Sequence, residues 1–120
     1  MSNNSILVGD IGGTHARFAI VDRDGSTSRL RDWLDLPDDF ASFAQALRHY
    51  LNGLERHRVP DVIALAVAGP VADGKVSFTN RNWQLSESEL RSSGFRVAHL
   101  LNDFVALAYA ADRLRPSDVR

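Results

Sequence analysis

The feature that most constrains this chain is a pair of apolar runs on either side of two adjacent glycines. The runs Ile6–Ile11 and Ala16–Asp22 flank Gly12-Gly13. Because glycine adopts positive φ angles without strain, this pattern predicts a β-hairpin that turns at the glycines. A third strand, Ser28–Leu36, is expected after a second turn signal at Asp22–Gly25. The first third of the sequence is therefore predicted to form three hairpin-linked strands.

Beyond residue 37 the sequence alternates between helical and strand-like patterns. Apolar residues recur at helical spacing from Phe40, so a helix is expected from there to about Glu55–Arg58, with Pro37-Asp38-Asp39 before it. The run Val62–Ala68 is continuously apolar, as in a strand covered on both faces. The remaining expected elements are a hairpin-like stretch over Val71–Thr79 that turns at Asp73-Gly74, a helix started by the capping box of Ser86 and Glu89, a strand over Arg96–Leu101 and a helix over Phe104–Arg113. This order, β-β-β-α-β-(hairpin)-α-β-α, predicts an α/β fold with a five-stranded mixed sheet flanked by helices.

Composition narrows the classes of function. The chain has 120 residues, of which 44% are hydrophobic and 24% charged, and this fits a single globular domain spanning residues 1–120. A net charge of −1 provides no general attraction to nucleic acid or to an anionic membrane. The chain has no cysteine, and its four histidines lack metal-ligand spacing, so they are expected on helix surfaces or strand edges. Without a signal peptide or a long apolar run, we expect a cytoplasmic protein with no nucleic-acid or membrane partner.

Asp10 is the first candidate functional residue, because it places a carboxylate at the end of an apolar strand. Burying part of a carboxylate costs free energy unless the group has a partner. The bare amides of Gly12 and Gly13, followed by the Thr14 hydroxyl, can form an anion-binding nest. The spacing fits neither a Walker loop nor a dinucleotide fingerprint. An ordinary hairpin turn with an incidental aspartate therefore remains open beside a phosphate site.

The pair Asn102-Asp103, directly after the last expected strand, is the second candidate. On its own it fits a helix N-cap better than a reactive site. Chemically, the amide can bond sugar hydroxyls and the carboxylate can accept a hydroxyl proton. A base with a pKa near ~3.9 is weak, but phosphoryl transfer depends mainly on positioning and charge neutralisation. Because Asp10, Gly69 and Asn102-Asp103 all follow apolar strands, we expect three segments to converge at one edge of the sheet.

The loop Thr79–Trp83 is the third candidate. Its amide, guanidinium and hydroxyl groups beside an aromatic ring suit a polyol ligand. A solvated loop anchored by one buried tryptophan explains the same composition, and is the simpler interpretation when the loop is taken alone.

Together, four runs of this sequence resemble the N-terminal part of bacterial glucokinases, which belong to the hexokinase–actin–Hsp70 superfamily. The runs are Leu7–Arg17, Ala66–Val71, Thr79–Trp83 and Leu101–Phe104, in the order and spacing of that family. The resemblance implies a ribonuclease H-like (actin-like ATPase) domain, the small N-terminal domain of a two-domain sugar kinase. It also implies that the parent enzyme transfers the γ-phosphate of ATP to glucose, giving glucose 6-phosphate in the first step of glycolysis.

The resemblance assigns the nucleotide side of the site to the first run. Asp10 would hold Mg²⁺ through a water molecule. Gly12, Gly13 and Thr14 would lie against the phosphates of ATP. His15 stands where relatives commonly carry asparagine, which leaves the role of this position open.

On the sugar side, the resemblance makes Asp103 the general base for the 6-hydroxyl of glucose and Asn102 a ligand of the sugar hydroxyls, with Asn80 lining the same pocket. The sequence contains no match to the family's second phosphate motif, its adenosine motif or its further glutamate and histidine sugar ligands. We therefore expect a C-terminal domain of the same enzyme to supply these groups. We also expect the 120-residue chain alone to be inactive and to self-associate, with a homodimer as one form.

Three alternatives remain open at this stage. The parent enzyme could phosphorylate another hexose or an amino sugar, because half of the sugar pocket lies elsewhere. A non-catalytic sugar sensor would be expected to carry a DNA-binding helix-turn-helix before the first strand, whereas only the five residues Met1–Ser5 precede Ile6. An actin- or Hsp70-like ATPase would share the phosphate hairpin but has no reason to keep Asn102-Asp103.

Overall fold

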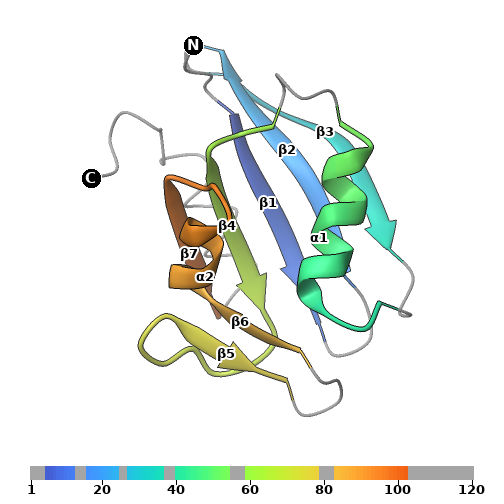
Figure 1. Ribbon diagram of the computed structural model, residues 1–120. Helices are drawn as coiled ribbons and strands as arrows, with labels where there is room; N and C mark the ends of the chain where they lie inside the picture. The colour runs from blue at the N-terminus through green and yellow to red at the C-terminus, as the bar shows by residue number, and fades with distance from the viewer. Residues whose placement is uncertain are drawn as a thin grey trace.

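The computed structural model describes residues 5–12, 16–24, 27–36, 40–54, 59–78 and 83–102. In this part of the chain, five strands form one sheet in the order β3-β2-β1-β4-β7, and two short strands, β5 and β6, pair separately (Figure 1). The strands are β1 (Ser5–Ile11), β2 (Ala16–Asp24), β3 (Thr27–Leu36), β4 (Val62–Val67), β5 (Lys75–Ser77), β6 (Gln84–Ser86) and β7 (Val97–Leu101), and the helices are α1 (Phe43–Asn52) and α2 (Glu87–Ser92).

The sheet is mixed, as predicted. β1, β2 and β3 pair antiparallel, whereas β1 with β4 and β4 with β7 pair parallel. The three parallel strands therefore end at the same edge of the sheet, beside the β5–β6 hairpin (Figure 1). The α/β fold is confirmed, and so is the expected order of elements as far as β7, apart from the additional short strand β6. The predicted helix Phe104–Arg113 lies outside the described residues.

Side-chain alternation gives the sheet two apolar faces. On one face, Leu7 and Ile11 pack in a cluster that includes Phe43 and Tyr50 of α1. On the other face, Ile6 and the alternate residues of neighbouring strands form a second cluster. All six residues of β4 are buried, which explains why its sequence is continuously apolar. Both described helices lie on the first face (Figure 1).

α1 is shorter than the apolar spacing predicts. The helix begins after Ser42, whose Oγ accepts the Gln45 N–H at 3.2 Å, so the cap lies two residues beyond Phe40. It ends at Asn52, and Gly53 donates its N–H to Tyr50 O at 3.1 Å. Phe40 still packs against the core although it precedes the helix, which is why it fits the helical spacing.

The expected turn at Asp73-Gly74 is present. Ala72 and Lys75 exchange two backbone hydrogen bonds of 3.0 Å, and the residues between them have φ angles of 54° and 71°. Two consecutive positive φ angles are typical of a type I′ turn. The principal partner of β5 is β6, a strand that the sequence analysis does not predict, because three residues are too few to show an alternating pattern.

Ser86 and Glu89 cap the start of α2 as predicted, with the Glu89 carboxylate bonded to the Ser86 hydroxyl. Ser86 Oγ accepts the Glu89 N–H at 3.1 Å and lies 3.1 Å from Glu89 Oε1, to which it donates. No helix in the described part of the chain is long and apolar enough to cross a membrane.

Candidate functional site

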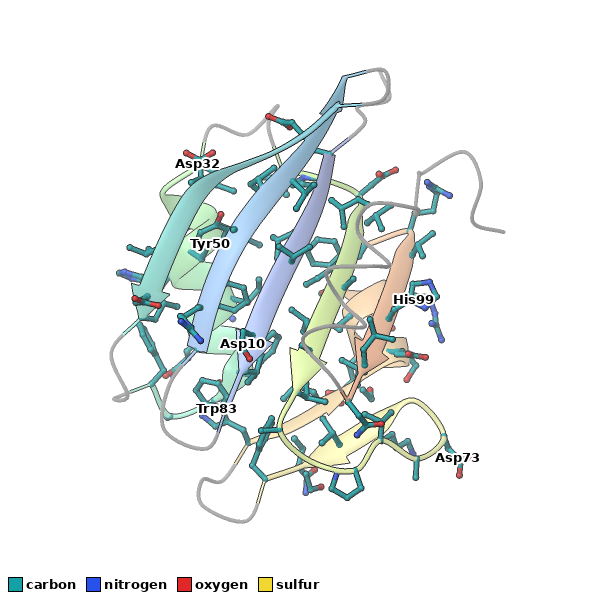
Figure 2. The ribbon with its side chains drawn as sticks, turned by 180° about the vertical axis from the view of Figure 1, so that it is seen from behind. Asp10, Asp32, Tyr50, Asp73, Trp83 and His99 are labelled. Atoms are coloured by element: carbon teal, nitrogen blue, oxygen red, sulfur yellow. The ribbon has the colours of Figure 1, made fainter. Side chains whose placement is uncertain are left out.

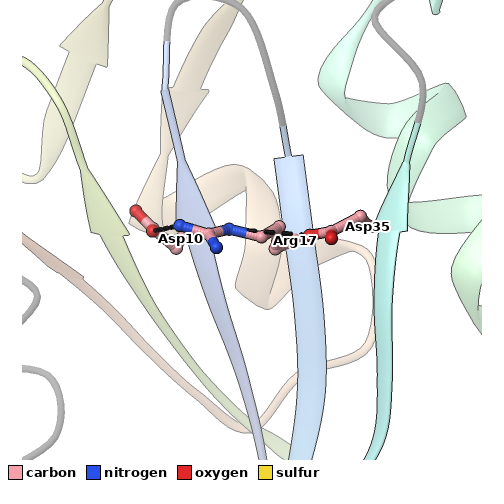
Figure 3. A network of polar contacts seen from close by, with 3 residues as sticks. All are labelled: Asp10, Arg17 and Asp35. Carbon is pink, nitrogen blue, oxygen red and sulfur yellow. Dashed lines mark hydrogen bonds and ion pairs between the residues drawn. The ribbon is translucent and has the colours of Figure 1, made fainter.

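Asp10 lies in a row of charged side chains that crosses three strands. It is opposite Arg17 in the β1–β2 register, and Arg17 is opposite Asp35 in the β2–β3 register. Arg17 Nη2 donates to Asp10 Oδ2 at 2.7 Å, and Arg17 Nε lies 3.6 Å from Asp35 Oδ1 (Figure 3). The partner that a carboxylate at the end of an apolar strand requires is therefore Arg17.

The geometry of Asp10 suits an ion held through water. Its side chain is 23% exposed, and only Oδ2 is engaged by Arg17. Oδ1 has no hydrogen-bond donor among the residues that the structure describes, so it is available to a water or a cation. These residues also contain no group of three or more histidine and acidic side chains that could enclose a metal. A single carboxylate fits a Mg²⁺ ion that takes its other ligands from phosphate and water.

The hairpin between β1 and β2 is confirmed. Ile11 pairs with Ala16, so the four residues 12–15 connect the two strands. Gly12 is buried at the start of this connection. Gly13, Thr14 and His15 lie outside the described residues. The phosphate contacts expected of Gly12, Gly13 and Thr14 remain predictions, and the role of His15 stays open.

Asn102 joins the ends of two parallel strands. It directly follows β7, and its Nδ2 donates to the carbonyl oxygen of Gly69, in the segment after β4. Because the amide donates through Nδ2, its oxygen, Oδ1, can still accept a hydrogen bond from a hydroxyl group. The predicted convergence of Gly69 and Asn102 is therefore confirmed by a direct hydrogen bond.

Asp10 and Asn102 belong to the same edge of the sheet. In the parallel register Asp10 is opposite Ala66 of β4, and Ala66 is opposite Leu101, the last residue of β7. Two strand spacings of about 4.8 Å therefore separate the backbone of Asp10 from that of Leu101. The view from behind in Figure 2 shows Asp10 near the end of β1 that faces the β5–β6 hairpin. Asp103 and Asn80, the other predicted sugar-side residues, lie outside the described residues.

Trp83 is a core residue. Its side chain is buried, its Nε1 donates to Phe40 O at 3.1 Å, and its ring meets Phe43 edge-on with centroids 5.9 Å apart. This geometry agrees with the anchored-loop interpretation of Thr79–Trp83 as far as the tryptophan is concerned.

The described histidines differ in burial: His49 has the expected surface position, whereas His99 is on an edge strand but its Nε2 is buried without a hydrogen-bond partner among the described residues. His49 is exposed on α1, with its ring 5.3 Å from that of Phe40, and His99 lies on β7 at the edge of the described sheet.

Sequence reasoning missed two partners at this edge of the sheet. It did not identify Arg17 as the partner of Asp10. With four residues between Ile11 and Ala16, however, the hairpin register places Asp10 directly opposite Arg17. It also missed Glu87, whose carboxylate accepts the Leu100 N–H at 2.9 Å. No local pattern indicates that contact, because the two residues are brought together only by the packing of α2 on β7.

In comparisons with known proteins, this chain matches one family. A family model described as glucokinase matches residues 7–120. A glucokinase of Caulobacter sp. (strain K31) is 50% identical over 118 residues, covering 95% of this chain and 35% of that protein. A glucokinase of Xanthomonas oryzae pv. oryzae (strain MAFF 311018) is 43% identical over 117 residues, covering 95% of this chain and 34% of that protein. The chain thus spans about a third of the length of the curated relatives it matches.

Solved structures agree with the sequence matches. The crystal structure of a glucokinase from an Antarctic psychrotroph matches with a TM-score of 0.79 and 40% identity, over 95% of this chain and 37% of that one. A glucokinase from Balamuthia mandrillaris in complex with glucose matches with a TM-score of 0.59 and 22% identity, over 90% of this chain and 32% of that one, which shows a common fold.

Proposed function

Because the chain belongs to the glucokinase family, we propose that it is the N-terminal domain of an enzyme that transfers the γ-phosphate of ATP to the 6-hydroxyl of glucose. In this proposal residues 1–120 form the small domain of a two-domain kinase. A C-terminal domain supplies the adenosine pocket and the remaining sugar ligands. The length of the relatives, about three times the matched region, supports this division.

The observation that carries the proposal is the placement of Asp10 and Asn102 at one edge of the sheet. The carboxylate of Asp10 is held by Arg17 through one oxygen, and the amide of Asn102 is held by Gly69 through its nitrogen. Each side chain therefore keeps one oxygen available while its orientation is fixed. Such preorganised polar groups suit a reaction that depends on positioning and charge neutralisation.

The proposed roles divide between the two strand ends. Asp10 would hold Mg²⁺ through water, beside phosphates bound by Gly12, Gly13 and Thr14, and the ion would neutralise charge on the β- and γ-phosphates. Asn102, with Asn80, would orient the sugar. Asp103 would accept the proton of the 6-hydroxyl of glucose. The hydroxyl oxygen would then bond to the γ-phosphorus, while the bond between the γ-phosphorus and the oxygen of the β-phosphate breaks. The products are glucose 6-phosphate and ADP.

The remaining parts of the proposal concern setting and assembly. An enzyme that consumes ATP and makes a sugar phosphate for glycolysis belongs in the cytoplasm, where both are used. The isolated chain would lack the other half of the cleft, so we expect it to be inactive and to self-associate, for example as a homodimer, which light scattering at high concentration can test.

The test is a coupled assay of the full-length enzyme with ATP and Mg²⁺, on glucose and on a panel of other hexoses and amino sugars. Glucose is expected to have the highest kcat/KM. Asp103→Asn should lower kcat by orders of magnitude while the circular dichroism spectrum stays unchanged, because the substitution preserves shape and removes the base. Near-normal turnover in that variant would refute the assigned base, and a preference for another sugar would refute the assigned substrate.

A further inference from the structure

Glu87 connects three segments that are distant in sequence. It is the first residue of α2, and its Oε2 accepts the N–H of Leu100 in β7 at 2.9 Å. Its own backbone N–H donates to Gly74 O at 2.8 Å. A Cβ placed on Gly74 would lie 2.8 Å from Glu87 Oε1, so the turn before β5 lies directly against this carboxylate. The carboxylate is thus fixed between the turn and the outer strand.

The end of β7 is held by β4, by the core around Leu100 and by Glu87. β7 is the last strand of the described sheet, so only β4 pairs with it there. The Leu100 N–H donates a hydrogen bond to the carboxylate of Glu87, and Leu100 precedes Asn102 by two residues. The hydrogen bond from Asn102 Nδ2 to Gly69 then closes the strand end against the segment after β4. The two hydrogen bonds, at Leu100 and at Asn102, thus flank the last residue of β7.

The β5–β6 hairpin supports the other side of the same contact. A Cβ on Gly69 would lie 3.2 Å from Val76 Cγ2, so the acceptor of Asn102 packs on β5. Gly74, in the turn before β5, packs on Glu87. Both sides of the contact between Gly69 and Asn102 are therefore packed against the small unit formed by β5, β6 and α2. Within this unit, β5 and β6 lie at the carboxyl edge of the sheet and α2 lies over β7 (Figure 1).

We propose that Glu87 is a positioning residue for the sugar side of the site: it fixes the end of β7 through Leu100 and so orients Asn102 toward its ligand. The inference deepens the proposed function and rests on it. Removing the carboxylate leaves the buried Leu100 N–H without its acceptor. The outer strand is then less firmly held two residues before Asn102, and sugar binding is weakened. The nucleotide side is left intact, because Asp10 is held by Arg17 from β2.

The test compares three variants of the full-length enzyme. Glu87→Ala should raise the KM for glucose about tenfold with the KM for ATP within about twofold, since small displacements of a binding group cost this much or more. Glu87→Gln keeps an acceptor oxygen, so its KM for glucose should be close to that of the wild type. Glu89→Ala is the matched control, because it removes a carboxylate from the same turn of α2, one that bonds to Ser86 and not to the Leu100 N–H. In Glu87→Ala, and not in the other two variants, the backbone amide of Leu100 should exchange its hydrogen about tenfold faster than in the wild type.

Each unfavourable outcome has a separate meaning. If Glu87→Ala and Glu89→Ala behave alike, or if exchange at Leu100 accelerates without a change in the KM for glucose, Glu87 merely stabilises α2 or β7 and the inference is wrong. If the wild-type enzyme leaves glucose unphosphorylated, the proposed function is wrong and the sugar-side role of Glu87 falls with it.

Discussion

Arg17 on β2 donates from Nη2 to Asp10 Oδ2 across 2.7 Å, and the two residues are directly opposite in the β1–β2 register. The same guanidinium lies 3.6 Å from Asp35 on the far side of β2 (Figure 3). One cation thus lies between two carboxylates, and it engages only one oxygen of Asp10. Arg17 neutralises Asp10 while fixing the direction in which the other oxygen is available.

The first prediction concerns Arg17→Met in the full-length enzyme. The substitution keeps the aliphatic stem and removes the group that orients Asp10. We expect the Mg²⁺ concentration needed for half-maximal activity to rise about 10- to 100-fold, the usual effect of removing the partner of a metal-ligating side chain. Stability should fall by no more than about 1 kcal/mol, because both side chains are partly exposed.

Asp35→Asn is the control for that substitution. Asp35 is 67% exposed and its contact with Arg17 is longer, so its loss should leave the Mg²⁺ dependence nearly unchanged. Arg17→Met with the Mg²⁺ dependence of the wild type would show that Asp10 does not need its partner.

The sequence predicts this fold well because its main signals are local. The glycine pair between Ile11 and Ala16 and the capping box at Ser86 each act within a few residues. The register then makes Arg17 the partner of Asp10, a step that requires only counting across the hairpin. By contrast, the contact of Glu87 with Leu100 depends on how α2 packs, and β6 pairs through only three residues. These features arise from tertiary packing, which no periodic pattern in the sequence records.

The second prediction is that Gly9→Ala destabilises the domain by about 1–3 kcal/mol, as overpacking of a core does. A Cβ on Gly9 would lie 2.7 Å from Leu65 Cδ2 and 3.1 Å from Phe18 Cδ1, and both of these side chains are fully buried. Urea denaturation measures the effect. Gly53→Ala is the matched control: its φ of −84° suits alanine and its nearest contact is 3.5 Å, so it should be neutral or stabilise by up to about 1 kcal/mol. Equal stabilities for the two variants would contradict the packing of β1 on β4.

The third prediction is that Ser86→Ala lowers the free energy of unfolding by about 1 kcal/mol, because the Glu89 N–H loses its acceptor at the start of α2. Ser86→Thr retains a hydroxyl and should recover most of the loss. A double-mutant cycle with Glu89→Ala should show coupling between the two side chains, since the Ser86 hydroxyl also donates to Glu89. Strict additivity in that cycle would argue against the capping box.

The fourth prediction uses Trp83 to separate the two interpretations of the loop that precedes it. Trp83→Phe removes the Nε1 donor of Phe40 O and part of the ring volume at a site that is 3% exposed, so stability should fall by about 1–3 kcal/mol in thermal or urea unfolding.

If residues 79–82 carry a sugar ligand at Asn80, loosening their anchor should also raise the KM for glucose several-fold while the KM for ATP stays constant. If the loop is only solvated chain anchored by a tryptophan, the stability loss should appear with no change in either KM. Trp83→Leu, which also removes the edge-on contact with Phe43, should cost more stability than Trp83→Phe. The difference between these variants measures the aromatic contact separately from the hydrogen bond. We expect the sugar-linked outcome, because Trp83 fixes the chain only three residues after Asn80.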